Sequence, residues 1–244
     1  MSQTTYQRFA QYPQSGVIMA SLVIVLWTAM LTYNLAFYEV DYTSPLTYLL
    51  VLVQMHLFTG LFITAHDAMH GLVAPKNPKL NHFFGKLTLG LFIFNSYKIL
   101  RPKHYEHHRY AGSDKDPDFH HGNGNFFVWF WHFMMEYITW KQILAAAITF
   151  NIFKLFLPQE NLVLFWIVAS ILSLFQLFFF GTFMPHMGEQ ENAHHATSQG
   201  KNHLWAFLSC YFFGYHYEHH DSPQTPWWRL WEVKEAELAK AKSA

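Results

Sequence analysis

The 244-residue chain is hydrophobic and electrically neutral: 52% of its residues are hydrophobic, 13% are charged, and 16 basic residues balance 16 acidic ones. Soluble proteins average about 25% charged residues, and zero net charge leaves no basic surface for nucleic acid. The single cysteine, Cys210, excludes an intramolecular disulfide, a cysteine-rich zinc site and a cysteine-held iron–sulfur cluster. Because histidine occurs 17 times, we expect any metal site to be built from imidazole groups.

Four apolar stretches predict membrane-spanning helices, which need about 20 mostly apolar residues each. The third stretch is the shortest and carries Lys154 near its end. The predicted spans are residues 16–37, 45–65, 142–157 and 161–184. A fifth apolar segment, residues 83–100, contains two lysines and is more typical of an interfacial or re-entrant hairpin. The sequence therefore predicts an all-α integral membrane protein with about four transmembrane helices in two hairpins, plus interfacial helices, in one domain over residues 1–244.

The distribution of basic residues predicts which end of the spans faces the cytoplasm. The turns at residues 38–45 and 158–161 are acidic and contain no lysine or arginine. Basic residues lie before the first span (Arg8), in the central segment and in the C-terminal tail. The positive-inside rule therefore places both termini and the central segment on the cytoplasmic side. The number of membrane crossings then places the histidine motifs on that same face. These motifs are described in the next paragraph.

Three histidine motifs have the spacing of ligands on one side of a helix. HDAMH at residues 66–70 has histidines at i and i+4, and HYEHH, at residues 104–108 and again at 216–220, has them at i, i+3 and i+4. Together with a histidine just after the last span, they give nine nitrogen donors in a cytoplasmic cap. Nine exceed the roughly four ligands of one zinc ion and suit two ions with four or five each. Imidazole suits zinc, copper, iron and nickel, and spacing alone does not decide between iron and zinc. The candidate ligands are His66, His70, His104, His107, His108, His186, His216, His219 and His220.

The motifs and their flanking residues resemble a known family. The pattern HxxxH, HxxHH, HxxHH is similar to that of the membrane fatty-acid desaturase and hydroxylase superfamily. The segments TGLFITAHDAMHG (59–71), GSDKDPD (112–118), FGTFMPH (180–186) and FGYHYEHH (213–220) resemble more closely the bacterial-type β-carotene ketolases, or 4,4'-oxygenases. The resemblance extends from about residue 20 to residue 231.

This resemblance implies a membrane-embedded, non-haem di-iron oxygenase that uses dioxygen and two external electrons per turnover. Carbon 4 of a carotenoid β-ionone ring would be hydroxylated twice and dehydrated to a ketone, which converts β-carotene to echinenone and canthaxanthin. The family's iron ligands correspond to the eight motif histidines, and His186 is the candidate for a ninth. The loop 187–203 leaves open whether His194, His195 or His203 takes that place. Because the chain has no glycine-rich dinucleotide motif, we expect an external electron donor such as a cytoplasmic ferredoxin.

Carboxylates near the motifs are candidates for assisting catalysis by fixing the orientation of a ligand imidazole. Asp67 lies inside the first motif. Asp114, Asp116 and Asp118 either form a turn with the neighbouring proline or contact a ligand, and of these we favour Asp114 and Asp118.

Three other functions compete with the ketolase hypothesis. A carotenoid ring hydroxylase or a fatty-acyl desaturase would share the histidine motifs and differ in product. A membrane zinc hydrolase would need a carboxylate base, for which Asp67 is the candidate. A haem carrier or metal transporter is the weakest alternative, since its histidines would lie within opposed spans rather than at one face.

Overall fold

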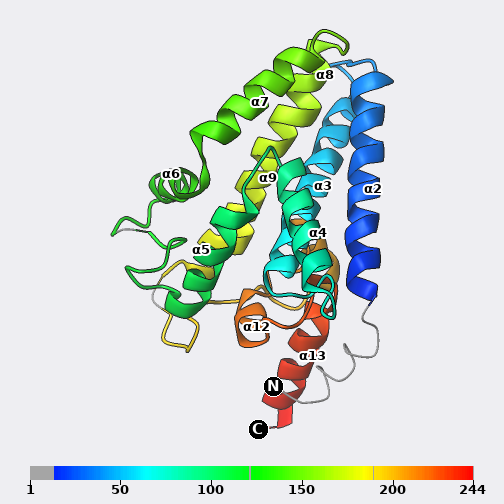
Figure 1. The fold of residues 1–244 in the computed structure, drawn as a ribbon. Coiled ribbons are helices and arrows are strands. Elements are labelled where there is room, and N and C mark those ends of the chain that lie inside the picture. Colours follow the sequence, from blue (N-terminus) through cyan, green and yellow to red (C-terminus); the bar gives the residue numbers. More distant parts are fainter. Residues whose placement is uncertain (1–13, 121, 189, 244) are drawn as a thin grey trace.

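The computed structural model describes residues 14–120, 122–188 and 190–243. Residues 1–13, which include Arg8, lie outside the described part, so the side assigned to the N-terminus stays a prediction. Within the described residues, all regular structure is helical, which confirms the predicted helical class. Figure 1 shows long helices side by side, with shorter helices gathered at the end where the C-terminus lies.

In the described part of the chain, three helices are long and apolar enough to cross a membrane, with 22, 25 and 28 residues. The first two are α2 (Ser15–Ala36) and α3 (Pro45–Met69), which match the first hairpin expected from the sequence. The third is the continuous helix Gln159–His186. It combines α8 (Gln159–Asn161), the π-helix η1 (Leu162–Val168), α9 (Ala169–Phe178), the π-helix η2 (Phe179–Phe183) and α10 (Met184–His186).

The fourth expected span, residues 142–157, is shorter than predicted. Helix α7 (Trp140–Phe153) has 14 residues and buries none of them. Such a helix is about 21 Å long, which is less than the roughly 30 Å hydrocarbon core of a bilayer. Three helices rather than four therefore meet the length requirement among the described residues. Helix α7 still links α6 (Phe126–Tyr137) to α8 at the far end of the molecule, so the last long helix runs back toward the C-terminal end (Figure 1).

The segment predicted as an interfacial or re-entrant hairpin consists of two helices. Helix α4 (Pro78–Leu91) and helix α5 (Tyr97–Tyr110) are joined by a turn in which Ile93 and Phe94 have positive φ angles of 48° and 55°. Both helices pack against α3. The side-chain amide of Asn81 on α4 donates to the Ala68 carbonyl at 2.7 Å, and the Tyr97 hydroxyl at the start of α5 donates to the same carbonyl at 2.8 Å. These bonds fix α5 against the end of α3.

At the far end, buried amide side chains connect the long helices. Asn34 on α2 donates to Gln54 on α3 at 3.3 Å. Asn161 donates to the backbone carbonyls of Asn34 and Tyr38 at 2.7 Å each. Buried polar groups in an apolar environment are costly unless hydrogen-bonded, so these bonds favour one register between the three helices.

The C-terminal segment folds back beneath the ends of the long helices. It contains α11 (His203–Cys210), α12 (His216–Asp221), the 3₁₀ helix η3 (Trp227–Arg229) and α13 (Leu230–Ser243). Tyr211 and Phe212 have positive φ angles of 49° and 64° and reverse the chain between α11 and α12. Figure 1 shows α12 and α13 at the lower end of the molecule, near the ends of α3 and α5.

We predict that Gly85→Ala lowers the thermal midpoint, because a Cβ at this position of α4 would overlap the ring of Tyr97. Overpacking of this kind costs about 1–3 kcal/mol. The matched control is Gly90→Ala in the same helix, where a Cβ meets nothing within 4 Å and helix propensity favours alanine by about 1 kcal/mol. Thermal unfolding of the detergent-solubilised protein measures both, and equal midpoints for the two variants would contradict the packing argument.

Candidate metal centre

The nine predicted histidines come from four helix segments that meet at one end of the molecule. His66 lies in the last turn of α3 and His70 caps that helix. Helix α5 carries the first HYEHH motif, α10 ends with His186, and the six-residue helix α12 carries the second HYEHH motif. Spacings of three and four residues place each motif's histidines on one helix face, and the packing of α5 and α12 near the end of α3 brings these faces together.

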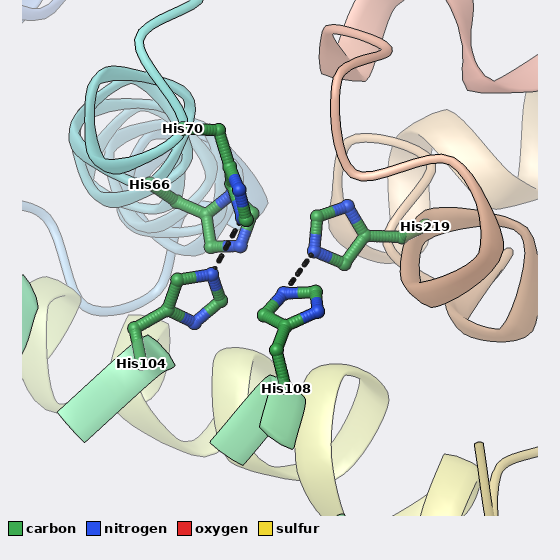
Figure 2. Close-up of side chains that lie close together, drawn as sticks. All are labelled: His66, His70, His104, His108 and His219. Carbon is green, nitrogen blue, oxygen red and sulfur yellow. Dashed lines mark hydrogen bonds between the residues drawn. The ribbon is translucent and has the colours of Figure 1, made fainter. Parts of the chain in front are cut away.

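The first group, which we call the five-histidine group, contains five ring nitrogens that all lie within 4.8 Å of one another. Its closest nitrogen pairs are Nε2 of His70 with Nε2 of His104, at 2.7 Å, and Nε2 of His108 with Nε2 of His219, at 3.0 Å. Figure 2 shows two rings entering from α3, two from α5 and one from α12, all converging on one point. The members are His66, His70, His104, His108 and His219.

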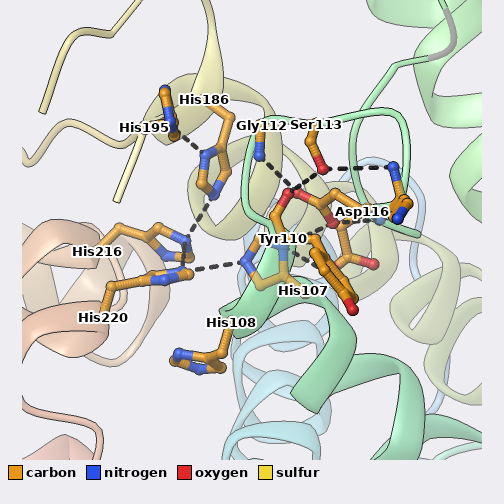
Figure 3. A network of polar contacts seen from close by, with 12 residues as sticks. His107, His108, Tyr110, Gly112, Ser113, Asp116, His186, His195, His216 and His220 are labelled. Carbon is orange, nitrogen blue, oxygen red and sulfur yellow. Dashed lines mark hydrogen bonds and ion pairs between the residues drawn. The ribbon is translucent and has the colours of Figure 1, made fainter. Parts of the chain in front are cut away.

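The second group, which we call the four-histidine group, consists of His107, His186, His216 and His220, all buried. Their Nε2 atoms form a chain of close contacts: His186 to His216 at 2.9 Å, His216 to His220 at 3.0 Å, and His220 to His107 at 3.1 Å. Figure 3 shows this chain and the polar contacts that surround it.

These contacts cannot all be hydrogen bonds between neutral imidazoles. Nδ1 of His107 donates to Asp116 at 2.9 Å and Nδ1 of His186 donates to the His195 carbonyl at 2.8 Å, so their Nε2 atoms carry lone pairs. If His216 and His220 donated to those lone pairs, their own N–H groups would face each other at 3.0 Å. A cation that accepts all four lone pairs removes this conflict. Imidazole nitrogens lie about 2.0–2.1 Å from a bound zinc ion, so two neighbouring ligands lie roughly 3 Å apart, as observed here.

The five-histidine group fits a cation for a separate reason. His66 is buried, and neither of its ring nitrogens has a hydrogen-bond partner. A buried polar group without a partner costs about 1–3 kcal/mol. Its ring centre lies 4.2 Å from that of His104 and 4.6 Å from that of His219. An ion at the centre of the group would give His66 the partner that the protein does not supply.

Adjacent histidines in each HYEHH motif belong to different groups. His107 and His220 are in the four-histidine group, whereas His108 and His219 are in the five-histidine group. The rings of His108 and His220 lie 4.3 Å apart, centre to centre. The two candidate ion positions are therefore neighbours, held by the same two helices.

Burial keeps most of these imidazoles neutral, which is the form that binds metal. Desolvation, followed by the neighbouring histidines, lowers the pKa of His104, His216, His219 and His220 well below the usual value, and lowers that of His108 to about 2. His107 is the exception. Burial acts to lower its pKa, but the carboxylates of Asp116 and Asp118 raise it above the usual value.

Asp116 is the carboxylate that orients a predicted ligand in the 112–118 loop. It is buried, and besides accepting from His107 it accepts from the backbone N–H groups of Gly112 at 3.0 Å and Asp118 at 2.9 Å. Burial acts to raise the pKa of Asp116, but His107 and these N–H groups hold it below the usual value. A ligand histidine that donates its second nitrogen to a carboxylate has a fixed orientation. The sequence favoured its neighbours Asp114 and Asp118, whereas the fold buries Asp116 and places it in contact with His107.

The three favoured carboxylates occupy different surroundings. Asp118 lies 3.8 Å from Nδ1 of His107 and accepts a short hydrogen bond from the Tyr137 hydroxyl. Burial raises the pKa of Asp118 to about 6. Asp67 is buried, with one oxygen 3.8 Å from Nδ1 of His66 and the other accepting from the backbone N–H of Trp227 at 3.2 Å. Asp114 is exposed and lies outside both groups.

Three loop histidines that competed with His186 also lie outside the two groups. His203 contacts the Tyr215 hydroxyl and the Glu235 carboxylate at 2.9 Å each. His195 donates to the Gln190 carbonyl at 2.8 Å. His194 lies 3.8 Å from the carboxylate of Asp221. His186 is therefore the histidine of this region that the fold brings to the other predicted ligands.

Glu218 of the second HYEHH motif anchors α12 to α13. Its side chain is 1% exposed and accepts from Lys234 at 2.6 Å and from the Ser198 hydroxyl. Nothing local in the sequence connects residues 218 and 234, so this anchor follows only from the fold.

A cavity of about 900 Å³ extends from the two histidine groups between α6–α7 and the Gln159–His186 helix. His66, His104, His107, His216 and His219 line it at the metal end. Most of the other lining residues are apolar and come from several helices, including α3, α6, α7, η1 and α9; Phe150, Leu174 and Phe175 are among them. This volume is near the upper end of the roughly 300–1,000 Å³ of small-molecule sites.

The fold and the site define a class of protein: a helical protein with apolar helices long enough for a membrane and two adjacent imidazole groups able to hold metal ions. The profile of the fatty acid desaturase family matches residues 43–160 and 128–243. The chain belongs to this family.

The curated relatives include proteins with ketolase names. The chain is 40% identical over 231 residues to a zeaxanthin 4-ketolase of Chlamydomonas reinhardtii, a match that covers 88% of this chain and 52% of that protein. It is 37% identical over 226 residues to a β-carotene ketolase of Paracoccus sp., covering 91% of this chain and 93% of that protein. A dihydrorhizobitoxine desaturase of Bradyrhizobium elkanii is 25% identical over 232 residues, covering 73% and 64%. The chain thus spans about half the length of the first of these relatives. No solved structure matches it.

We predict that Asp116→Asn weakens metal binding by about 10- to 100-fold, the usual effect of removing a carboxylate that orients a ligand histidine. The matched control is Asp114→Asn in the same loop, where the carboxylate is exposed. Competition with a chelator, followed by metal analysis, measures the affinity. Equal affinities for the two variants would contradict the assigned role of Asp116.

We also predict that Lys234→Ala lowers the thermal midpoint, since it leaves the buried Glu218 carboxylate without its ionic partner. Breaking a buried pair from one side costs about 3 kcal/mol. The control is Lys201→Ala, which removes a pair with Glu235 whose side chains are 50% and 40% exposed. Exposed ion pairs contribute little to stability, so we expect this control to leave the thermal midpoint nearly unchanged. If the control lowered the midpoint as much as Lys234→Ala does, burial of Glu218 would not be the cause of the destabilisation.

Proposed function

We propose that this protein is a di-iron, dioxygen-dependent oxygenase that converts the C4 methylene of carotenoid β-ionone rings to a ketone. One observation supports this above all: nine histidines, divided five and four, converge beside a mostly apolar cavity of about 900 Å³, and five of them line it. The ketolase names of relatives at 37–40% identity support the substrate and the reaction. All nine histidines are proposed as iron ligands, in a single desaturase-like unit.

The reaction takes two oxidations and one dehydration. In each oxidation a C4–H bond becomes C4–OH, one dioxygen, two electrons and two protons are consumed, and the second oxygen atom leaves as water. The resulting gem-diol loses water and leaves the ketone. Reaction at one ring of β-carotene gives echinenone, and reaction at both gives canthaxanthin. Two bound iron ions would supply the dioxygen activation that oxidation of a non-acidic allylic C–H bond requires.

The chain's own residues bind and orient the substrate. The apolar cavity takes the polyene between α7 and α9 and directs a terminal ring toward the histidines. Because its lining is mostly apolar, bound substrate excludes water from the metal end. Asp116 accepts a hydrogen bond from the Nδ1–H group of His107, which keeps the Nε2 lone pair of His107 directed at the metal position. Asp67 connects α3 to the start of η3 through the Trp227 N–H, and so holds His66 in place.

The metal centre is proposed to lie on the cytoplasmic side of the membrane. The acidic connections at residues 38–45 and 158–161 lie at the opposite end from the histidines, whereas Arg101, Lys103 and Arg109 lie on α5 beside them. The positive-inside rule favours this orientation. An external donor such as ferredoxin would then approach the five-histidine group, three of whose rings are only half-buried.

The alternatives have less support. A ring hydroxylase or an acyl desaturase would share the metal centre, but the desaturase relative is the more distant, at 25% identity. A zinc hydrolase needs a carboxylate base in contact with substrate. Asp67, the candidate for that role, is buried and engaged with a backbone N–H of the C-terminal segment.

We predict that cells which accumulate β-carotene form echinenone and canthaxanthin when they express this protein. His107→Ala should lower ketone formation by more than about 100-fold, because it removes a ligand together with the contact to Asp116. His194→Asn is the matched control, since His194 lies beside the four-histidine group but outside it. Pigment chromatography with mass spectrometry measures the products. Zeaxanthin alone, or altered lipid unsaturation with unchanged β-carotene, would refute the ketolase assignment.

A further inference from the structure

Thr182 places a hydroxyl group in the wall of the cavity close to the metal end. It lies in the π-helix η2, is 5% exposed and lines the cavity together with His107 and His216. It precedes the proposed ligand His186 by four residues in the same continuous helix, so the two side chains lie about one turn apart on one side of that helix.

The Thr182 hydroxyl differs from the other buried threonines of the helices. Thr59, Thr64 and Thr88 each donate to the backbone carbonyl four residues earlier, at 3.2, 2.8 and 2.9 Å, as threonines within helices commonly do. Among the hydrogen bonds of the described residues, none involves the Thr182 hydroxyl. Its oxygen is not one of the fully buried atoms that lack a partner, so it is accessible from the cavity that Thr182 lines. Winding with i→i+5 bonds moves the preceding carbonyls of the helix out of the usual position.

A hydroxyl that opens into a mostly apolar cavity can bind a polar atom of the ligand. When a ligand fills the cavity this hydroxyl loses contact with water, and leaving it unbonded is then costly. The neighbouring Gly181 adds no side chain to the wall. The position is not crowded, because a Cβ built on Gly181 would lie 3.8 Å from the nearest atom, in the Phe213 ring. The site can therefore take a ligand oxygen beside Thr182, near the proposed ligands His107 and His216.

An unoxidised β-ionone ring carries no oxygen, but the product of the first oxidation carries one at C4. For the second oxidation, the remaining C4–H must face the histidine groups while the new hydroxyl is directed aside. We propose that the Thr182 hydroxyl binds the C4 hydroxyl of the half-oxidised ring and holds it for the second oxidation. This inference rests on the proposed function, and it makes Thr182 a determinant of ketone rather than alcohol as the final product.

The test compares Thr182→Val, which replaces the hydroxyl by a methyl group of similar size, with Thr182→Ser, which keeps the hydroxyl. Thr88→Val is the matched control, because Thr88 is buried in α4, bonds its own helix and does not line the cavity. In β-carotene-accumulating cells, Thr182→Val should lower the ratio of ketone to 4-hydroxy product by about three- to tenfold, the range expected for one hydrogen bond. Thr182→Ser and Thr88→Val should keep the wild-type ratio.

A binding measurement tests the same contact without turnover. Quenching of tryptophan fluorescence in the purified protein, without dioxygen, gives the affinity for β-carotene and for 4-hydroxy-β-carotene. Thr182→Val should weaken binding of the hydroxylated ligand by about three- to tenfold and leave β-carotene unchanged. Equal weakening of both ligands, or of neither, would overturn the proposal, as would an unchanged product ratio. If the wild type forms neither product, the proposed function fails, while the binding comparison still decides the role of Thr182.

Discussion

The arrangement of this molecule depends on the mutual approach of buried, neutral imidazoles. Nε2 atoms 2.7 to 3.1 Å apart cannot all be donors and acceptors to one another. Without a cation, the lone pairs would repel, and His66 would be buried with no partner for either nitrogen. The contacts around the histidines are therefore best understood as a frame that holds nitrogen lone pairs in place before an ion binds.

Helix α5 is the central part of that frame. Its HYEHH motif contributes to both histidine groups, and its position is fixed by tyrosine hydroxyls that bond the carbonyls at the end of α3: Tyr97 to Ala68, and Tyr105 to Met69. The second HYEHH motif is fixed independently, through Glu218 and Lys234, to α13. Because adjacent histidines of one helix serve different groups, a shift of either helix would disturb both candidate ion positions together.

The short helix α7 has a consequence for the cavity. A helix that packed along the whole of the 28-residue helix Gln159–His186 would fill the space between them, whereas α7 has 14 residues, none of them buried. Its outer face carries exposed apolar side chains such as Leu144, Ile148 and Ile152, which suit contact with lipid. The cavity thus lies between an apolar surface and the histidines, which is the geometry that an apolar, membrane-dissolved substrate requires.

The sequence was enough to predict the helical class, the nine histidines that converge, and the first and third long apolar helices within two residues at each end. The predicted second helix began at the right residue and ended four residues too early. These features are local: apolar runs and i, i+3, i+4 spacings are properties of single helices. The tertiary structure alone decided the five-to-four division of the histidines, the contact of Asp116 rather than Asp114 with His107, the length of α7 and the unbonded hydroxyl of Thr182. Each of these depends on which distant segments pack together. His108 and His219, for example, are 111 residues apart in the chain and 3.0 Å apart in space, and no local pattern encodes that contact.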